Sequence, residues 1–169
     1  MGGNNRMNKK ELLILSQFRK NARENLTTAS RKIHVPISTL HDRLKRYEGS
    51  IITKHTALLN FGEIGFHLKV QIILKVNPTQ KKAVRDFLTK QPKVNTVYAL
   101  SNDYDFLFEL ILKDLFELTE FTEKLETFHI IDKHEFYIVE DVKREAFLTD
   151  LEWLDAEKSL NSSKYTKSI

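Results

Sequence analysis

Apolar residues recur at the 3.6-residue period of an α-helix in three stretches near the start of the chain. These are residues 9–21, residues 26–33, and a third stretch that starts at Ser38, a residue type suited to cap a helix, and ends at Gly49. The turn His34-Val35-Pro36 separates the second stretch from the third. This pattern predicts a helix–turn–helix unit.

A stretch rich in β-branched residues follows the third helix. Residues 51–60 read IITKHTALLN and predict a strand, which would be the wing of a winged helix–turn–helix. The two glycines of residues 61–66, FGEIGF, then predict the linker to a second domain.

From Phe66 onward the pattern changes to strands and helices in alternation. Period-two apolar residues predict strands over residues 67–76, 94–100, 106–112 and 130–139, and helical spacing predicts helices over residues 77–91 and 114–128. Asp114 is expected to cap the second of these helices. The order β-α-β-β-α-β is that of the split ferredoxin-like unit. The fold class that we expect is α+β, with an N-terminal winged helix–turn–helix followed by a ferredoxin-like αβ sandwich.

The strand over residues 106–112 is apolar on both faces. Phe106, Phe108, Leu110 and Leu112 lie on one face, and Leu107 and Ile111 lie on the other. In a ferredoxin-like unit the helices cover one face of the sheet, and apolar patches of that size are rarely exposed on monomers. We therefore expect a homodimer in which two sheets pack face to face.

Helical spacing returns near the C-terminus. Phe147, Leu148, Leu151 and Leu154 predict a helix packed on the body of the protein, and residues 146–169 are therefore expected to form a C-terminal helix and tail. The expected domains before it are a flexible arm (residues 1–7), the DNA-binding domain (8–60), the linker (61–66) and the ferredoxin-like domain (67–145).

Composition excludes several classes of protein and site. The chain has no Cys, which excludes disulfides and thiolate zinc sites, and its six histidines never fall at a metal-ligand spacing such as HExxH. No apolar run reaches the roughly 18 residues that a membrane span needs, and the start of the chain lacks the apolar region of a signal peptide. We expect a cytoplasmic protein without metal, cofactor or membrane contact.

The charge is unevenly distributed between the two halves. Residues 1–60 hold 12 Lys and Arg against 4 Asp and Glu, a net charge of +8, whereas residues 61–169 hold 15 against 19, a net charge of −4. A basic module joined to an acidic one is expected when only the basic module meets a polyanion. Duplex DNA is the expected partner.

The third helix of the basic module carries suitable chemistry for DNA. Arg43, Lys45 and Arg46 are expected on its outward side, and Ser38 and Thr39 stand in its first turn, where a recognition helix meets the groove. For each cation a solvated surface charge is the alternative interpretation, and for Ser38 the alternative is a helix cap alone.

Three stretches resemble the Lrp/AsnC (feast/famine) family of prokaryotic transcription regulators. They are ASRKIHVPISTLHDRLKRYE (residues 29–48), TALLNFGEIGF (56–66) and VYALSNDYDFLFEL (97–110), and in the family they are the recognition helix, the linker and the effector-domain hairpin. The resemblance spans roughly residues 8–145. It implies sequence-specific DNA binding, dimers through the sheets, further assembly into tetramers or octamers, and a small-molecule effector.

The resemblance also implies two sets of DNA-contacting residues, one at the floor of the major groove and one at the phosphates. The first set is Ser38, Thr39, His41, Asp42 and Lys45. The second set is Thr27, Arg43, Arg46 and Lys54.

Two positions depart from the family pattern in this region. His34 stands where the family turn usually has glycine, and a side chain at a left-handed position costs about 1 kcal/mol. Asp42 stands where a basic residue is common; its carboxylate is repelled by phosphates but can accept a hydrogen bond from a cytosine amino group. Both changes suggest an altered sequence preference.

The hairpin loop is the implied effector site, with amino acids as the implied effectors. Its residues are Ser101, Asn102, Asp103, Tyr104 and Asp105. Asn102 replaces the family's glycine and tolerates a positive φ, although its side chain would intrude on a ligand. A polar hairpin tip without a ligand is the alternative.

Enzyme motifs are missing from the sequence. It has no glycine-rich phosphate loop and no nucleophile elbow, so no catalytic residue is expected. Two alternatives to a DNA-binding regulator stay open. One is a tetrapyrrole (siroheme-type) decarboxylase on the same architecture, disfavoured because only Arg85 and Arg144 follow residue 60, and the other is a modulator that joins mixed oligomers and binds DNA poorly by itself.

Overall fold

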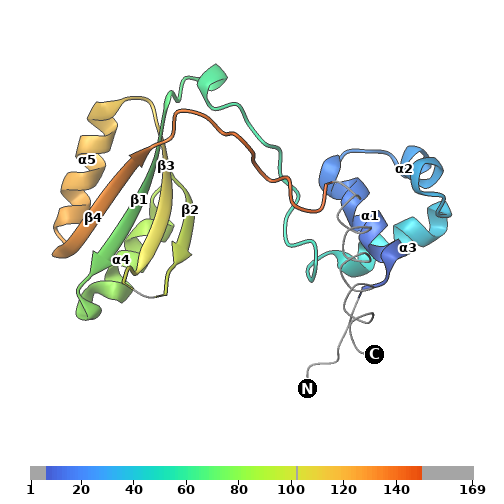
Figure 1. Cartoon of the computed structure of the whole chain (residues 1–169), viewed down its shortest axis with the longest axis horizontal. Coiled ribbons are helices and arrows are strands. Elements are labelled where there is room, and N and C mark those ends of the chain that lie inside the picture. The colour runs from blue at the N-terminus through green and yellow to red at the C-terminus, as the bar shows by residue number, and fades with distance from the viewer. Residues whose placement is uncertain (1–6, 102, 150–169) are drawn as a thin grey trace, which may run out of the picture. The chain divides into compact units, whose positions relative to one another are not determined.

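The computed structural model describes residues 7–101 and 103–149, and the chain divides into two units (Figure 1). Unit 1 comprises residues 1–57 together with residues 143–169, and unit 2 comprises residues 58–142. Each unit has its own cluster of buried apolar side chains.

Unit 1 contains the three predicted helices. They are α1 (Lys9–Lys20), α2 (Leu26–Ile33) and α3 (Ile37–Tyr47). Asn8 and Glu11 form a capping box at the start of α1, and the Asn25 side chain caps α2 by accepting from the N–H of Thr28. The hydrophobic core of the unit consists of Ile14, Leu15, Phe18, Ala29, Val35, Leu40 and Tyr47.

Helix α3 starts earlier than its sequence predicts. Pro36 occupies the N-cap, and its carbonyl accepts from the N–H of Leu40 at 3.0 Å, so the first helical residue is Ile37. The prediction that Ser38 caps the helix is wrong, because Ser38 is already inside the first turn. Within the described part of the chain, no side chain forms a capping hydrogen bond at the start of α3.

The turn between α2 and α3 contains a strained residue. His34 is the C-cap of α2 at φ 53° and ψ 46°, which is the left-handed conformation expected from its place in the turn. The N–H groups of His34 and Val35 both donate to the carbonyl of Ser30 at the C-terminal end of α2. This carbonyl is hydrogen-bonded at the cost of a left-handed conformation at His34.

Replacing His34 by glycine should stabilise unit 1. The substitution removes the Cβ clash of the left-handed conformation, and we expect the free energy of unfolding to rise by about 0.5–1 kcal/mol after the entropy of a more flexible unfolded chain is subtracted. Chemical denaturation of the full chain measures the change. His34→Ala is the control, since it keeps the Cβ; an equal gain in that variant would contradict the conformational explanation.

The predicted wing strand does not form. Residues 51–60 contain no strand, and the one bridge there joins Glu48 and Ile52. The carbonyl of Tyr47 accepts from the N–H groups of Ser50, Ile51 and Ile52, which curls the chain into a turn directly after α3. Apolar composition alone cannot make a strand where no neighbouring strand is available to pair with it.

Residues 143–149 also differ from expectation, because they form no helix. Instead they pack on α1: Arg19 forms an ion pair with Glu145 and donates from Nε to the carbonyl of Phe147 at 3.4 Å, and Leu148 lies against the core of unit 1. The rest of the predicted C-terminal helix lies outside the described residues.

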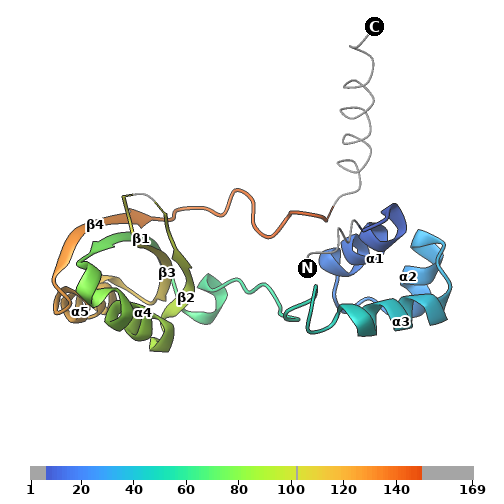
Figure 2. The same ribbon diagram turned by 90° about the horizontal axis from the view of Figure 1, so that it is seen from below.

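Unit 2 has the predicted β-α-β-β-α-β order. Its strands are β1 (Leu68–Val76), β2 (Val94–Ala99), β3 (Phe106–Leu112) and β4 (Ile130–Tyr137), and its helices are α4 (Lys81–Lys90) and α5 (Leu115–Glu126), with short 3-10 turns at Gly62–Ile64 and Pro78–Gln80. The four strands form one antiparallel sheet in the order β2-β3-β1-β4. Both helices lie on the same face of this sheet (Figure 2).

The core of unit 2 lies between that face and the two helices. The alternate apolar residues on one face of β1 and β3 are all buried except Leu68, which is partly buried. They meet Val84 and Leu88 of α4 and Leu118, Phe121 and Leu125 of α5. Phe121 stands at the centre, with ring centroids 5.7 Å from Phe87 and 5.9 Å from Phe108. The side chain of Asp114 caps α5 by accepting from the N–H of Glu117, as predicted.

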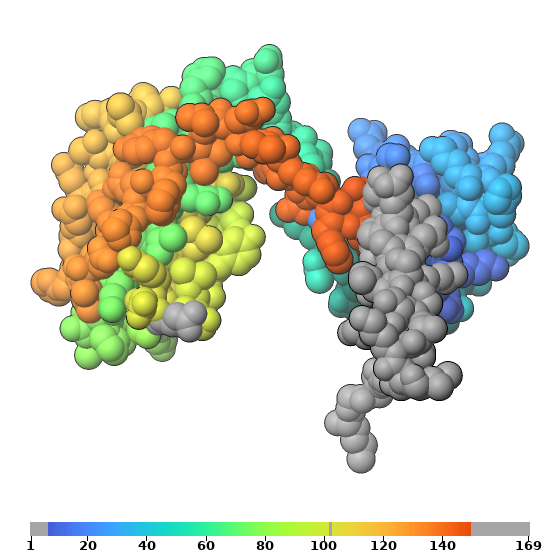
Figure 3. Space-filling model, in the orientation of Figure 1, coloured from blue at the N-terminus to red at the C-terminus, as the bar shows by residue number. Residues whose placement is uncertain are grey.

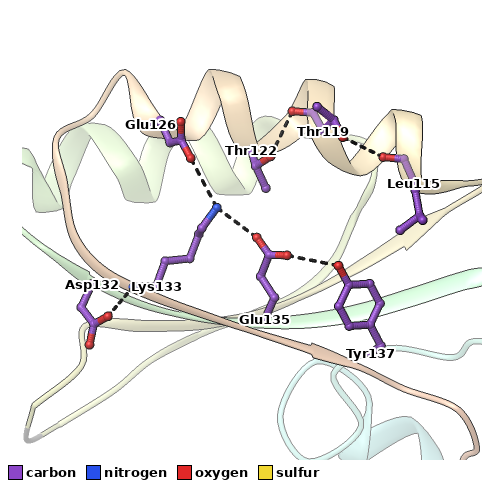
Figure 4. A network of polar contacts seen from close by, with 8 residues as sticks. All are labelled: Leu115, Thr119, Thr122, Glu126, Asp132, Lys133, Glu135 and Tyr137. Carbon is purple, nitrogen blue, oxygen red and sulfur yellow. Dashed lines mark hydrogen bonds and ion pairs between the residues drawn. The ribbon is translucent and has the colours of Figure 1, made fainter.

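A polar network ties β4 to α5 (Figure 4). The Nζ of Lys133 lies 3.5 Å from Glu126 on α5 and 3.0 Å from Glu135 on the same strand. The hydroxyl of Tyr137 donates to the same Glu135 at 3.4 Å. These contacts position the edge strand, whose Asp132 also accepts a hydrogen bond from Tyr104 in the loop of residues 101–105.

Candidate DNA-binding surface and effector loop

Four polar side chains form a stripe along the outer face of α3. Ser38, His41, Asp42 and Lys45 follow the i, i+3, i+4, i+7 spacing that brings residues onto one face of a helix, and all four are exposed. The opposite face of α3 is held in the core by Leu40, Leu44 and Tyr47. We call these four residues the α3 stripe.

The other residues predicted to contact DNA are exposed to differing degrees. Arg46 is exposed at the C-terminal end of α3, and Thr27 is exposed in the first turn of α2, whereas Thr39 is half-buried. Lys54 is exposed and lines a hollow of about 340 Å³ between α1 and residues 51–56. The structure therefore places Arg46, Thr27 and Lys54 at the surface of unit 1.

Arg43 does not point outward as expected. Its guanidinium forms an ion pair with Glu11 of α1, with side chains only 32% and 18% exposed. The other oxygen of Glu11 accepts from the N–H of Asn8 at 3.0 Å. Glu11 thus joins the start of α1 to the middle of α3, and Arg43 braces the two helices.

The predicted effector loop, residues 101–105, is anchored by its last residue, Asp105. One carboxylate oxygen accepts from the N–H of Val76 at 2.8 Å, and the other lies 2.6 Å from the Nζ of Lys81. The N–H of Asp105 itself donates to the carbonyl of Leu74 at 2.8 Å. Burial raises the pKa of Asp105, but the hydrogen bonds from Lys81 and Val76 outweigh it, and the net pKa is lowered.

Tyr104 forms the second anchor of the loop, because its side chain contacts residues of β4. Its hydroxyl donates to Asp132 at 3.1 Å, and its ring meets the edge of His134 at 5.8 Å between centroids. The hydrogen bond from Tyr104 is the main cause of a lowered pKa at Asp132. Burial raises the pKa of Tyr104, and Asp132 raises it further.

The remaining predicted loop residues are placed differently. Ser101 and Asp103 are exposed at the tip, and Asn102 lies outside the described residues. The sequence did not identify Lys81, Val76 or Asp132 as partners of the loop. For Lys81, the sequence did contain a signal: Lys81, Lys82 and Arg85 are spaced so that they share one face of a helix.

Neither a metal site nor a membrane-spanning helix is found in the part of the chain that the structure describes. Within residues 7–101 and 103–149, no three His, Cys, Asp or Glu side chains gather as a metal site would require. None of the helices in those ranges is long and apolar enough to cross a membrane.

Comparison with known proteins gives relatives of one kind. The sequence model of the Lrp/AsnC ligand binding domain matches residues 69–146. HTH-type transcriptional regulator FL11 of Pyrococcus furiosus is 28% identical over 133 residues, which cover 78% of this chain and 88% of the relative. An uncharacterized HTH-type transcriptional regulator of Pyrococcus horikoshii is 30% identical over 133 residues, covering 78% and 84%.

Solved structures show the same fold. A transcriptional regulator of Neisseria meningitidis, in complex with L-Met, superimposes with a TM-score of 0.78 at 21% identity, covering 88% of this chain and 99% of that one. Escherichia coli AsnC superimposes with a TM-score of 0.71 at 15% identity, covering 82% and 95%. With its helix–turn–helix, its ferredoxin-like sheet and these relatives, the chain belongs to the Lrp/AsnC family of DNA-binding transcription regulators.

Proposed function

We propose that the α3 stripe reads base edges in the major groove of DNA. The observation that carries this proposal is the common position of Ser38, His41, Asp42 and Lys45 on one exposed face of α3. Helix α3 is the second helix of the helix–turn–helix formed by α2 and α3, which is the helix that enters the major groove in this motif. Each side chain can donate to or accept from a base edge, and the surrounding residues 1–60 carry a net charge of +8. Arg46, Lys54 and Thr27 contact phosphates beside the groove. Thr39, half-buried in the first turn of α3, supports the stripe from its edge.

Arg43 has a different role in this proposal. Its guanidinium already pairs with Glu11, so it holds α3 at the correct angle rather than contacting a phosphate. Asp42 accepts a hydrogen bond from a base amino group, which cytosine presents in the major groove.

The bare face of the sheet supports a homodimer. The residues of β1 to β4 that point away from the helices include Ile73, Leu107, Ile111, Tyr98 and Phe136, and the last two are 57% and 49% exposed. Figure 3 shows much of the surface on this side formed by the strands, in green, yellow and orange. A second copy of the sheet would cover these side chains, and the resulting dimer could build tetramers or octamers.

A dimer presents two α3 stripes to one duplex. Half-sites should then lie about one helical turn, roughly 10 bp, apart or at a multiple of it. Selection of bound duplexes from a random pool at two salt concentrations tests this arrangement. A selected palindrome supports it, and the absence of any duplex preference in dilute buffer contradicts it.

Changes at His41 and Arg46 should have different consequences for DNA binding. Arg46→Ala removes one phosphate contact from each protomer, so affinity should fall for every duplex and the slope of log K against log salt should shrink by about 0.9 for each protomer bound. His41→Ala removes a base contact and should change which duplex is preferred, at a cost of about 1–3 kcal/mol on the selected operator. Titration of both variants at several salt concentrations measures these effects. Two variants indistinguishable from the wild type would refute the groove assignment.

The loop Ser101–Asp105 is the proposed effector site. Its end is anchored at Asp105 and Tyr104, while Ser101 and Asp103 are exposed to a ligand. The matching Neisseria structure is named as a complex with L-Met, which supports amino acids as one class of effector to test by calorimetry.

The protein is proposed to act without catalysis and in the cytoplasm, where a regulator meets its duplex. A tetrapyrrole decarboxylase would purify with porphyrin-type absorbance, and a modulator of mixed oligomers would bind no operator as a pure protein. Absorbance spectra and operator titration of the same preparation separate the three functions.

A further inference from the structure

We propose that a cationic hollow between α4 and the end of the effector loop binds small organic dianions, either dicarboxylates or phosphate monoesters. This inference deepens the proposed regulatory function, on which it rests, because it adds a second, anionic class of effector to the amino acids proposed for the loop. The hollow has a volume of about 370 Å³, within the range of metabolite sites. Its lining consists of Lys81, Lys82, Arg85, Ala99, Leu100, Asp105 and Phe106.

Three cations of one helix face enter this lining. Lys81 and Arg85 are four residues apart and Lys82 and Arg85 are three apart on α4, so their side chains are neighbours on the helix surface. Like charges at this spacing repel one another, and an anion between them would relieve the repulsion. Arg85 can also bind both oxygens of a carboxylate or phosphate at once, which Lys cannot do.

Both oxygens of the single carboxylate in the lining already have a partner. Both oxygens of Asp105 are bound, one to Lys81 and one to the N–H of Val76, and its side chain is only 13% exposed. It neutralises Lys81 but not Lys82 or Arg85, for which no carboxylate lies within ion-pair distance among the described residues. Asp86, the next carboxylate on α4, does not line the hollow. The hollow therefore keeps two positive charges.

This charge distribution selects against zwitterions. The ammonium group of a free amino acid would find no available carboxylate in the lining, because Asp105 is engaged, while Lys82 and Arg85 would repel it. A dianion matches the two remaining cations, and Leu100 and Phe106 offer an apolar wall to the carbon atoms of an organic ligand. Since Lys81 both lines the hollow and pairs with Asp105, a bound anion shares that cation with the effector loop.

Calorimetry on the full-length protein tests this site with four probes. They are succinate, glycerol phosphate, the neutral succinamide, and a panel of free amino acids, all at about 0.1 M salt. We expect heat from succinate or glycerol phosphate and none from succinamide. The double variant Lys82→Gln/Arg85→Gln should lose at least tenfold in affinity for the anion. Lys90→Gln/Lys113→Gln is the matched control: it removes the same charge from exposed positions of unit 2 outside the hollow and should bind like the wild type.

Several results would overturn the proposal. Equal heat of anion binding in both double variants would mean that anions bind only according to the net charge of the protein. The absence of heat from any dianion would show that the hollow is not a binding site. Operator titration on the same variants keeps the regulatory function separate, because anion binding can be measured whether or not DNA binds. A loss of operator affinity in Lys82→Gln/Arg85→Gln, without any anion heat, would assign these cations to DNA and not to an effector.

Discussion

Replacing Leu107 by aspartate is expected to convert the protein to a monomer and to weaken operator binding about 10²- to 10⁴-fold. Leu107 lies on β3 with Ile73 of β1 and Tyr98 of β2 as its cross-strand neighbours, in the middle of the bare sheet face. In a dimer through this face, symmetry brings two such carboxylates into the interface, and an unpaired buried charge costs several kcal/mol.

The fold of unit 2 should survive this substitution. The side chain of Leu107 points away from the helices, whereas its neighbours Phe106 and Phe108 fill the core. Circular dichroism and thermal unfolding check the fold, and sedimentation velocity gives the mass. Loss of operator affinity then follows from separating two helix–turn–helix units that otherwise bind one duplex together.

Thr119→Asp is the control for the added charge. Thr119 is exposed on α5, on the opposite side of the sheet from Leu107, and its change should leave mass and DNA affinity unaltered. A Leu107→Asp protein that still sediments as a dimer at micromolar concentration would show that the sheets do not form the interface.

Replacing Arg43 by alanine is expected to lower the free energy of unfolding but to leave the salt dependence of DNA binding unchanged. The substitution leaves the carboxylate of Glu11 without its cation in a mostly buried position, and we expect a loss of about 1–3 kcal/mol in the free energy of unfolding. The salt dependence of operator binding should stay that of the wild type, because no phosphate contact is lost. Chemical denaturation and DNA titration at three salt concentrations measure the two quantities.

A double-mutant cycle identifies the cause of that loss. If Arg43 and Glu11 stabilise each other, Glu11→Ala and the double variant should each cost little more than Arg43→Ala alone, and the coupling energy should exceed about 0.5 kcal/mol. Arg46→Ala, on an exposed neighbouring site, should show the reverse pattern, with stability kept and the salt slope reduced. A reduced salt slope in Arg43→Ala would instead assign its guanidinium to a phosphate.

The secondary structure was largely predictable because helices and strands depend on spacings a few residues long. The alternation in 106–112 predicted the two faces of β3, and Asp114 was identified as a helix cap from its position before an apolar run. The failures also have local causes. Pro36, and not Ser38, occupies the N-cap of α3, and the carbonyl of Tyr47 accepts from three N–H groups where a wing strand had been expected.

The partners of the candidate site residues could not be predicted in this way. Arg43 was expected at the outer surface because its helix is cationic, yet Glu11, 32 positions earlier, binds it. The same holds for Asp105, whose carboxylate joins Val76, 29 positions earlier, to Lys81. A pattern along one helix or loop contains no information about which distant side chain will pack against it.

By itself, the sequence determined the order of helices and strands, the two-sided apolar strand, and the separation of positive from negative charge, because each follows from residue type and short-range periodicity. The tertiary structure alone decided which cations are already paired and which remain available to a ligand or to DNA. That choice depends on distances between residues far apart in the chain, and packing of the helices and strands sets those distances.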